Sequence, residues 1–236
     1  MRTHAAQFRF EQVINLSTGE NLYHEILLPP GAANLTGGDI QGFVERAEAT
    51  GMIACIDRSV LELAIEKLEE DKHAAMGVNL SYATIQSIGP SILRRIKQLS
   101  SGMRTRIVLE ITETVKPSRL NECHHFIVDV KKLGVRVALD DFGCGHHDTA
   151  SPTFFNGMRF MPDIIKIDGS IMRGYSLKKN SKRIASAVAN ARVFGTSVVG
   201  EHIESEDILE FARSIGIEFG QGHHFQNNQF VAPLIS

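Results

Sequence analysis

Short apolar runs alternate along the chain with longer segments of helical periodicity. Two such runs, at 8–16 and 22–28, flank the turn STGEN and predict a β-hairpin. Further apolar runs occur at 76–81, 106–112, 135–141, 162–168, 197–203 and 218–225. Apolar residues at helical spacing predict helices at 40–50, 58–68, 120–133, 182–194 and 206–215, and in a segment ending near Gln98. This alternation predicts an α/β fold of βαβ units around a parallel sheet, with residues 1–236 forming a single domain.

Nearly every predicted strand ends in a polar side chain, although a parallel strand that is buried on both faces should be almost entirely apolar. The polar residues at these ends are Glu25, Asn79, Glu110, Asp140 with Asp141, Lys166 with Asp168, Glu201 and Gln221. In a barrel, the carboxyl ends of parallel strands meet at one mouth, where catalytic groups gather. One such acid could simply cap a helix or face solvent, but its recurrence on successive strands favours a functional site.

The converging carboxylates point to hard divalent cations. Without cations, acids that meet at one mouth repel each other, which raises their pKa values. Carboxylate and amide oxygens suit Mg²⁺, Mn²⁺ or Ca²⁺, whereas zinc prefers His and Cys. Asp140 and Asp141 can both serve one site because the strand ends there, and one of them could bridge two metals, as in phosphodiester hydrolysis. Lys166 could orient a nucleophilic water or stabilise charge on a phosphate, or it could form a structural ion pair.

Composition and charge narrow the possible partners. The chain has 236 residues with 43% hydrophobic and 22% charged residues and a net charge of −2, so no basic excess predicts binding to a DNA or RNA polymer. Three widely spaced cysteines predict free thiols in a reducing compartment. No stretch approaches 18 apolar residues, so we expect a cytoplasmic protein with no membrane association through this chain.

A series of motifs resembles the ordered motif set of the EAL domain family, which comprises cyclic di-GMP phosphodiesterases and their non-catalytic relatives. The motifs are HEILL, GVNLS, LEITET, LDDFGCG, DIIKIDGS, VVGEHIES and FGQGHHF, and they cover about residues 12–225. The resemblance implies a TIM-like (β/α)8 barrel whose first strand is antiparallel, which agrees with the opening hairpin. It further implies cyclic di-GMP as the ligand, hydrolysed at one phosphodiester bond to linear pGpG, and a homodimer built near residues 140–166.

The resemblance also implies a role for each polar position, with a cofactor of two Mg²⁺ or Mn²⁺ ions. One metal would be held by Glu25, Asn79, Glu110 and Asp140, and the second by Asp140, Asp141 and Glu201. Lys166 and Glu201 would be catalytic, with Lys166 orienting the water between the metals. The substrate would contact Leu27 and Gln221. Supporting positions would be Glu113, Asp168 and Glu204.

Three departures from the family pattern leave alternatives open. Pro29 stands where active relatives place the arginine of EALxR, which contacts a ligand phosphate. The loop after Asp141 reads FGCGHHDT in place of FGTGYSS, and Gln221 is followed by GHHFQNNQ. The domain could therefore be a weak or inactive receptor for cyclic di-GMP, a protein-interaction module, or an unrelated barrel enzyme acting on another phosphoester.

The histidine pairs and Cys144 do not point to other chemistry. Adjacent histidines on extended chain point in opposite directions, so the pairs at 124–125, 146–147 and 223–224 do not predict a zinc site. Cys144 is interpreted as an ordinary small side chain, because nothing beside it would lower the pKa of its thiol in an obvious way.

Overall fold

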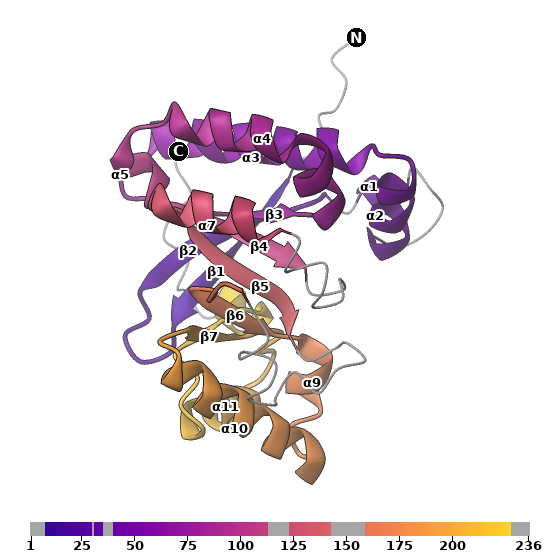
Figure 1. The fold of residues 1–236 in the computed structure, drawn as a ribbon. Helices are drawn as coiled ribbons and strands as arrows, with labels where there is room; N and C mark the ends of the chain where they lie inside the picture. The colour runs from indigo at the N-terminus through magenta and orange to yellow at the C-terminus, as the bar shows by residue number, and fades with distance from the viewer. Residues whose placement is uncertain (1–7, 30, 35–39, 113–122, 143–158, 228–236) are drawn as a thin grey trace.

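A computed structural model of the chain describes residues 8–29, 31–34, 40–112, 123–142 and 159–227. Within these residues the strands close into one barrel, in sequence order around the ring (Figure 1). The strands are β1 (Arg9–Asn15), β2 (Asn21–Leu27), β3 (Met76–Leu80), β4 (Ile107–Thr112), β5 (Arg136–Phe142), β6 (Ile164–Ile167), β7 (Ser197–Gly200) and β8 (Phe219–Gly220). The predicted TIM-like barrel is confirmed.

The first strand runs against its neighbours, as expected. β1 pairs antiparallel with β2 on one side and with β8 on the other, whereas every other neighbouring pair is parallel. The hairpin turn is held by Asn15, whose side-chain oxygen accepts hydrogen bonds from the backbone N–H groups of Ser17 and Thr18. The carboxyl ends of β2–β8 therefore meet at one rim, which we call the mouth.

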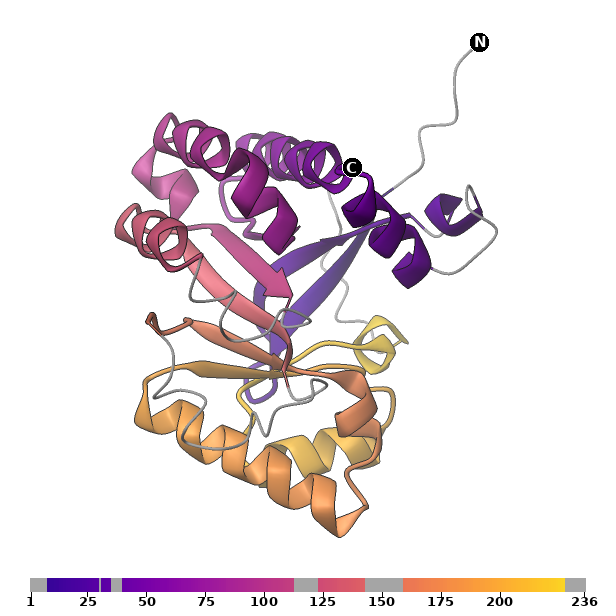
Figure 2. The same cartoon turned by 45° about the vertical axis from the view of Figure 1, so that its right-hand side comes forward.

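Helices cover the outside of the barrel (Figures 1 and 2). They are α1 (Gly31–Asn34), α2 (Ile40–Ala49), α3 (Ile53–Glu70), α4 (Tyr82–Lys97), α5 (Ser101–Arg104), α7 (His124–Lys132), α9 (Gly169–Arg173), α10 (Lys178–Val193), α11 (Glu206–Ser214) and α12 (His223–Asn227). In both views α3, α4 and α7 lie on one side of the barrel and α10 and α11 on the other. The predicted helices at 58–68 and 182–194 both begin earlier than expected, at Ile53 and Lys178.

The apolar run at 218–225 forms a strand only near its start, so its expected length as a strand is wrong. β8 ends after Gly220, and α12 begins at His223. Gly222 has φ 150°, and a Cβ there would lie 2.4 Å from the backbone nitrogen of Ile203, so the chain turns where only glycine fits. The histidine pairs at 124–125 and 223–224 lie in helices α7 and α12, not in extended chain as expected. Neither pair joins a candidate metal cluster among the described residues. The pair at 146–147 and Cys144 lie outside those residues.

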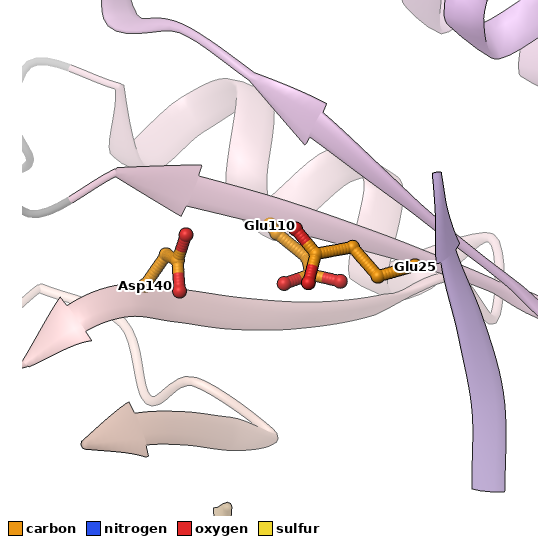
Figure 3. A group of neighbouring side chains, drawn as sticks. All are labelled: Glu25, Glu110 and Asp140. Carbon is orange, nitrogen blue, oxygen red and sulfur yellow. The ribbon is translucent and has the colours of Figure 1, made fainter. Parts of the chain in front are cut away.

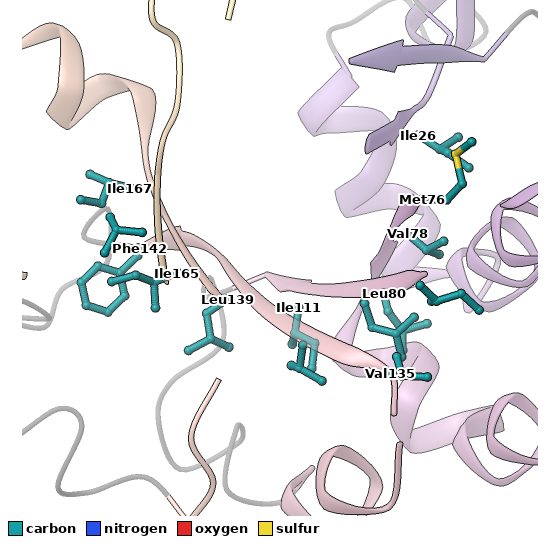
Figure 4. Close-up of a cluster of buried hydrophobic side chains, with 14 of the residues drawn as sticks. Ile26, Met76, Val78, Leu80, Ile111, Val135, Leu139, Phe142, Ile165 and Ile167 are labelled. Atoms are coloured by element: carbon teal, nitrogen blue, oxygen red, sulfur yellow. The ribbon is translucent and has the colours of Figure 1, made fainter. Parts of the chain in front are cut away.

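Side chains alternate between the two faces of the barrel wall. The outward set is apolar and packs against the helices, as Figure 4 shows for Ile26, Val78, Ile111, Leu139 and Ile165. The inward set forms a smaller apolar cluster inside the barrel, which we call the lower layer: Val13, Tyr23, Val108, Ala138, Ile164 and Val199. No helix in the described part of the chain is long and apolar enough to span a bilayer.

Candidate metal centre

The polar strand ends predicted from the sequence gather inside the barrel at the mouth. Five of them lie two residues beyond a residue of the lower layer, so strand periodicity turns them inward as well. Tyr23 is followed by Glu25 in this way, and Ile164 by Lys166. We call the resulting group the mouth cluster: Glu25, Asn79, Glu110, Asp140, Lys166, Glu201 and Gln221.

Lys166 is the centre of the mouth cluster, and its side chain is only 1% exposed. Its Nζ contacts a carboxylate from each of four other strands or strand ends. The distances are 2.6 Å to Glu110 Oε2, 2.9 Å to Glu25 Oε2, 3.0 Å to Glu201 Oε1 and 3.1 Å to Asp140 Oδ1. One buried ammonium is thus shared among four carboxylates, and together these acids raise the pKa of Lys166 against the effect of its burial.

Glu25 accepts hydrogen bonds on both of its carboxylate oxygens. Asn79 Nδ2 donates to its Oε1 at 2.7 Å, and Gln221 Nε2 donates to its Oε2 at 2.7 Å. Burial acts to raise the pKa of Glu25, but Lys166 and these two donors outweigh burial and lower it. Glu25 therefore stays ionised in the interior.

The negative charge of three other acids at the mouth is not fully compensated. Burial, followed by the charge of Glu25, raises the pKa of Glu110 to about 8. Burial also raises the pKa of Glu201 well above its usual range, and burial and Asp140 raise that of Asp141 to about 6. Lys166 therefore does not compensate all four of the carboxylates that contact it. A cation bound here would favour the ionised forms of these acids.

Several buried oxygens of the cluster have no hydrogen-bond donor among the described residues, and all are acceptors. They are Asn79 Oδ1, both carboxylate oxygens of Glu110, Asp140 Oδ1 and Gln221 Oε1. Lys166 approaches two of them within ion-pair distance but without hydrogen-bond geometry. Buried acceptors without donors are costly, and carboxylate and amide oxygens are the ligands of hard divalent cations. The donor set therefore fits hard divalent cations chemically.

The acids form two groups that share Asp140. Glu25, Glu110 and Asp140 make up the first group, which Figure 3 shows converging from β2, β4 and β5. Asp140, Asp141 and Glu201 make up the second. Within each group, one oxygen from every residue lies within 4.8 Å of the others, as ligands of one ion must. This geometry suits two neighbouring cations with Asp140 between them.

The remaining predicted positions lie around this centre. Leu27 is half-buried at the end of β2, on the same inward face as Glu25. Asp168 caps α9, accepting a hydrogen bond from the Ser170 N–H at 2.7 Å, and its charge adds to the raised pKa of Asp141. Glu204 points away toward α12, 3.9 Å from His223 Nδ1. Glu113 lies outside the described residues.

The sequence interpretation missed two residues that shape the centre from below. Tyr23 is fully buried, and burial, then Glu110, raises the pKa of its hydroxyl. At Gly77 a Cβ would lie 2.3 Å from Glu110 Oε1 and 2.7 Å from the Tyr23 ring, so glycine leaves the room both side chains occupy. Both precede a predicted site residue by two positions, so strand alternation could have identified them.

Backbone strain is also found at the mouth. Among the described residues, the non-glycine positions with positive φ are Asp141 at 55° and His202 at 50°. Each directly follows a mouth-cluster acid, Asp140 or Glu201. Residues with a Cβ avoid this conformation unless the surrounding structure imposes it, and such strain concentrates at functional sites.

Comparisons with known proteins place this architecture in a family. The cyclic di-GMP phosphodiesterase PdeF of Escherichia coli (strain K12) is 27% identical over 221 residues, which are 91% of this chain but only 28% of PdeF. The FimX EAL domain of Pseudomonas aeruginosa bound to cyclic di-GMP superimposes with a TM-score of 0.75 at 23% identity, covering 93% of this chain and 89% of that one.

A manganese and cyclic di-GMP complex of Klebsiella pneumoniae BlrP1 gives a TM-score of 0.74 at 20% identity, covering 94% of this chain and 55% of that one. These structural similarities support the fold. The family model of the EAL domain matches residues 2–228, almost the whole chain. The chain belongs to the EAL domain family.

Proposed function

We propose that this domain hydrolyses one phosphodiester bond of cyclic di-GMP to give linear pGpG, with two Mg²⁺ or Mn²⁺ ions as cofactor. One observation carries the proposal: two acid groups share Asp140 around a buried lysine, and several of their buried oxygens have no hydrogen-bond donor among the described residues. A two-metal arrangement of this kind stabilises both the attacking and the leaving oxygen of a phosphodiester. PdeF, a cyclic di-GMP phosphodiesterase by name, supports the choice of substrate.

The proposal gives each mouth residue a role. Glu25, Asn79, Glu110 and Asp140 would hold one ion, and Asp140, Asp141 and Glu201 the other. The bound ions would supply Lewis-acid stabilisation of the charge that develops on the phosphate. Lys166 offers its N–H donors at the centre of the cluster, where they orient the attacking water together with Glu201. Gln221 and Leu27 border the substrate.

The test is turnover of cyclic di-GMP by the purified chain with Mg²⁺ or Mn²⁺, followed by chromatographic detection of pGpG. Glu25→Ala should lower turnover by about 100-fold or more, since it removes both a ligand and a partner of Lys166. Glu69→Ala, an exposed acid on α3, is the matched control and should have wild-type activity. Binding of cyclic di-GMP without any metal-dependent turnover would contradict the catalytic half of the proposal.

Pro29 favours a second candidate, a receptor that binds cyclic di-GMP with little or no hydrolysis. Pro29 is buried, and its carbonyl accepts a hydrogen bond from the Ala32 N–H at 2.9 Å, so this position provides no cation for a phosphate. A hydrogen bond to a charged group contributes about 1.5–3 kcal/mol. Pro29→Arg should therefore tighten binding by about tenfold or more if the missing contact limits the natural protein.

A further inference from the structure

His202 has a backbone conformation that few residues with a Cβ adopt. Its φ is 50°, in the left-handed region, where a residue with a Cβ is strained and glycine is not. The backbone is fixed on both sides: the Glu201 N–H donates to the Ile167 carbonyl at 3.1 Å, and the Ile203 N–H donates to the Gln221 carbonyl at 2.9 Å. The fixed backbone therefore sets the direction of the His202 Cα–Cβ bond.

The side chain packs against Gly169, just after the end of the neighbouring strand β6. A Cβ placed on Gly169 would lie 2.0 Å from Nδ1, 2.3 Å from Cγ and 2.7 Å from Cβ of His202, and these are its three nearest atoms. The imidazole ring thus rests directly on the α-carbon of Gly169. Gly169 does not have a positive φ, so what it supplies here is space, not an unusual conformation.

The imidazole ring of His202 lies at the mouth. Gly169 follows β6 and Asp168, and His202 follows β7 and Glu201, so both residues lie at carboxyl ends of parallel strands. His202 nevertheless remains exposed to solvent. Its direct neighbour Glu201 belongs to the second acid group.

A purely structural role does not account for the ring. Within the described part of the chain, the imidazole makes no hydrogen bond, ion pair or ring stacking, and it is not a member of either acid group. An exposed ring contributes little burial to the fold, while its backbone is strained. A positioned imidazole N–H that has no acceptor among the described residues is suited to donate a hydrogen bond to an anionic group that arrives from solvent.

We propose that His202 is a ligand-binding residue of this domain, whose imidazole N–H donates a hydrogen bond to a phosphate oxygen of the cyclic dinucleotide next to the second acid group. The proposal rests on the proposed function, because it takes its ligand from there. It adds a phosphate contact just after β7, on a different part of the rim from Pro29, which follows β2.

His202→Gly separates ligand binding from stability. Glycine relieves the left-handed strain, so the thermal midpoint should rise or stay unchanged, while the affinity for cyclic di-GMP falls about tenfold. Affinity is measured as KM where the protein turns the ligand over and as Kd where it only binds. His73→Gly removes an exposed imidazole from the segment before β3, at the opposite end of the barrel, and should leave affinity unchanged. His202→Asn keeps an N–H donor on a residue that tolerates positive φ, and should retain affinity within a few-fold.

Gly169→Ala tests the contact between Gly169 and the His202 imidazole through a double-mutant cycle. In the wild-type background the new methyl group displaces the imidazole, so affinity should fall about as far as in His202→Gly. In the His202→Gly background the same alanine meets no ring and should have no further effect. Wild-type affinity in His202→Gly, or an equal loss from Gly169→Ala in both backgrounds, would overturn this inference alone. A wild-type protein that neither binds nor hydrolyses cyclic di-GMP would overturn the proposed function itself.

Discussion

Five residues of the mouth cluster each lie two positions beyond a lower-layer residue, yet the lower layer and the mouth cluster differ in nearly every physical respect. The lower layer is apolar apart from one phenol, and its residues fill the barrel interior. The mouth cluster is also largely buried, but it places four acids around one lysine and contains acceptors that have no donor among the described residues. A single register thus produces a stabilising core and a costly polar site from adjacent inward positions.

The contrast shows where stability is given up for function. Burial of apolar side chains lowers the free energy of folding by roughly 25 cal/mol per Å², whereas buried charge must be paired and hydrogen-bonded to avoid a penalty. In the mouth cluster only Glu25 has donors on both oxygens. The fold holds the remaining acids in place against their mutual repulsion, and four measurements can test this account.

The largest effect is expected for Lys166→Met, which removes the shared partner of four acids. The metal-free protein should lose about 3–5 kcal/mol of unfolding free energy, because buried carboxylates are left uncompensated. Chemical denaturation measures it. Lys67→Met removes an exposed ion pair with Glu70 on α3 and should cost only about 0–1 kcal/mol. Equal losses in the two variants would show that Lys166 is not the electrostatic centre.

The second-largest expected effect is a pH dependence of the stability of the metal-free protein, which bound cations should cancel. The pKa of Glu110 is about 8 in the folded protein against 4.5 as a free side chain, so the folded state holds this proton more tightly. Its stabilising contribution is present below pH 4.5 and is lost as the pH rises through 8. The metal-free thermal midpoint should therefore fall between about pH 6 and pH 8.5. At the higher pH, Mg²⁺ or Mn²⁺ at 100 times its Kd should restore about 2.7 kcal/mol.

Gly77→Ala should disturb both layers where they meet. The added methyl group collides with Glu110 and Tyr23, an overpacking that costs about 1–3 kcal/mol and should also weaken metal binding. Gly102→Ala is the matched control, since a Cβ there meets nothing within 4 Å. Calorimetric metal titration and thermal unfolding of both variants measure the difference. Unchanged metal affinity in Gly77→Ala would mean that the layers are independent at β3.

The smallest effect is expected for Ile164→Val, which trims one methyl group from the lower layer beneath Lys166. It should lower the unfolding free energy by about 0.5–1.5 kcal/mol and leave the metal dependence of stability unchanged. Urea denaturation with and without Mg²⁺ measures both quantities. A shift in metal dependence would show that packing in the lower layer sets the geometry of the mouth.

The barrel and most of the mouth cluster could be predicted because their signals are local. Strand alternation, and polar residues such as Glu110 and Lys166 at the ends of apolar runs, are visible in the sequence itself. Tyr23 and Gly77 were missed because their importance depends on which strands pair. The register that places Gly77 beside Glu25 and Val108 cannot be read from one chain.

Other features were missed because the backbone departs from what the residue type suggests. A histidine in the sequence does not by itself predict the positive φ of His202, because sequence patterns usually indicate a positive φ by a glycine. The end of the barrel was predicted as a strand through Phe225 because its apolar run continues past Gly220. Close contact between Gly222 and the Ile203 backbone, a tertiary feature, ends the strand instead.

Asp140 belongs to both acid groups, and this sharing has a consequence for how the two ions would bind. An ion in either group fixes the carboxylate that the other group also uses, so the occupancies are thermodynamically linked. Linkage is reciprocal: whatever factor the first ion contributes to the affinity of the second, the second returns to the first. A metal titration of this domain should therefore follow one cooperative or anticooperative isotherm, and Asp140→Ala should convert it into the curve of independent, weak sites.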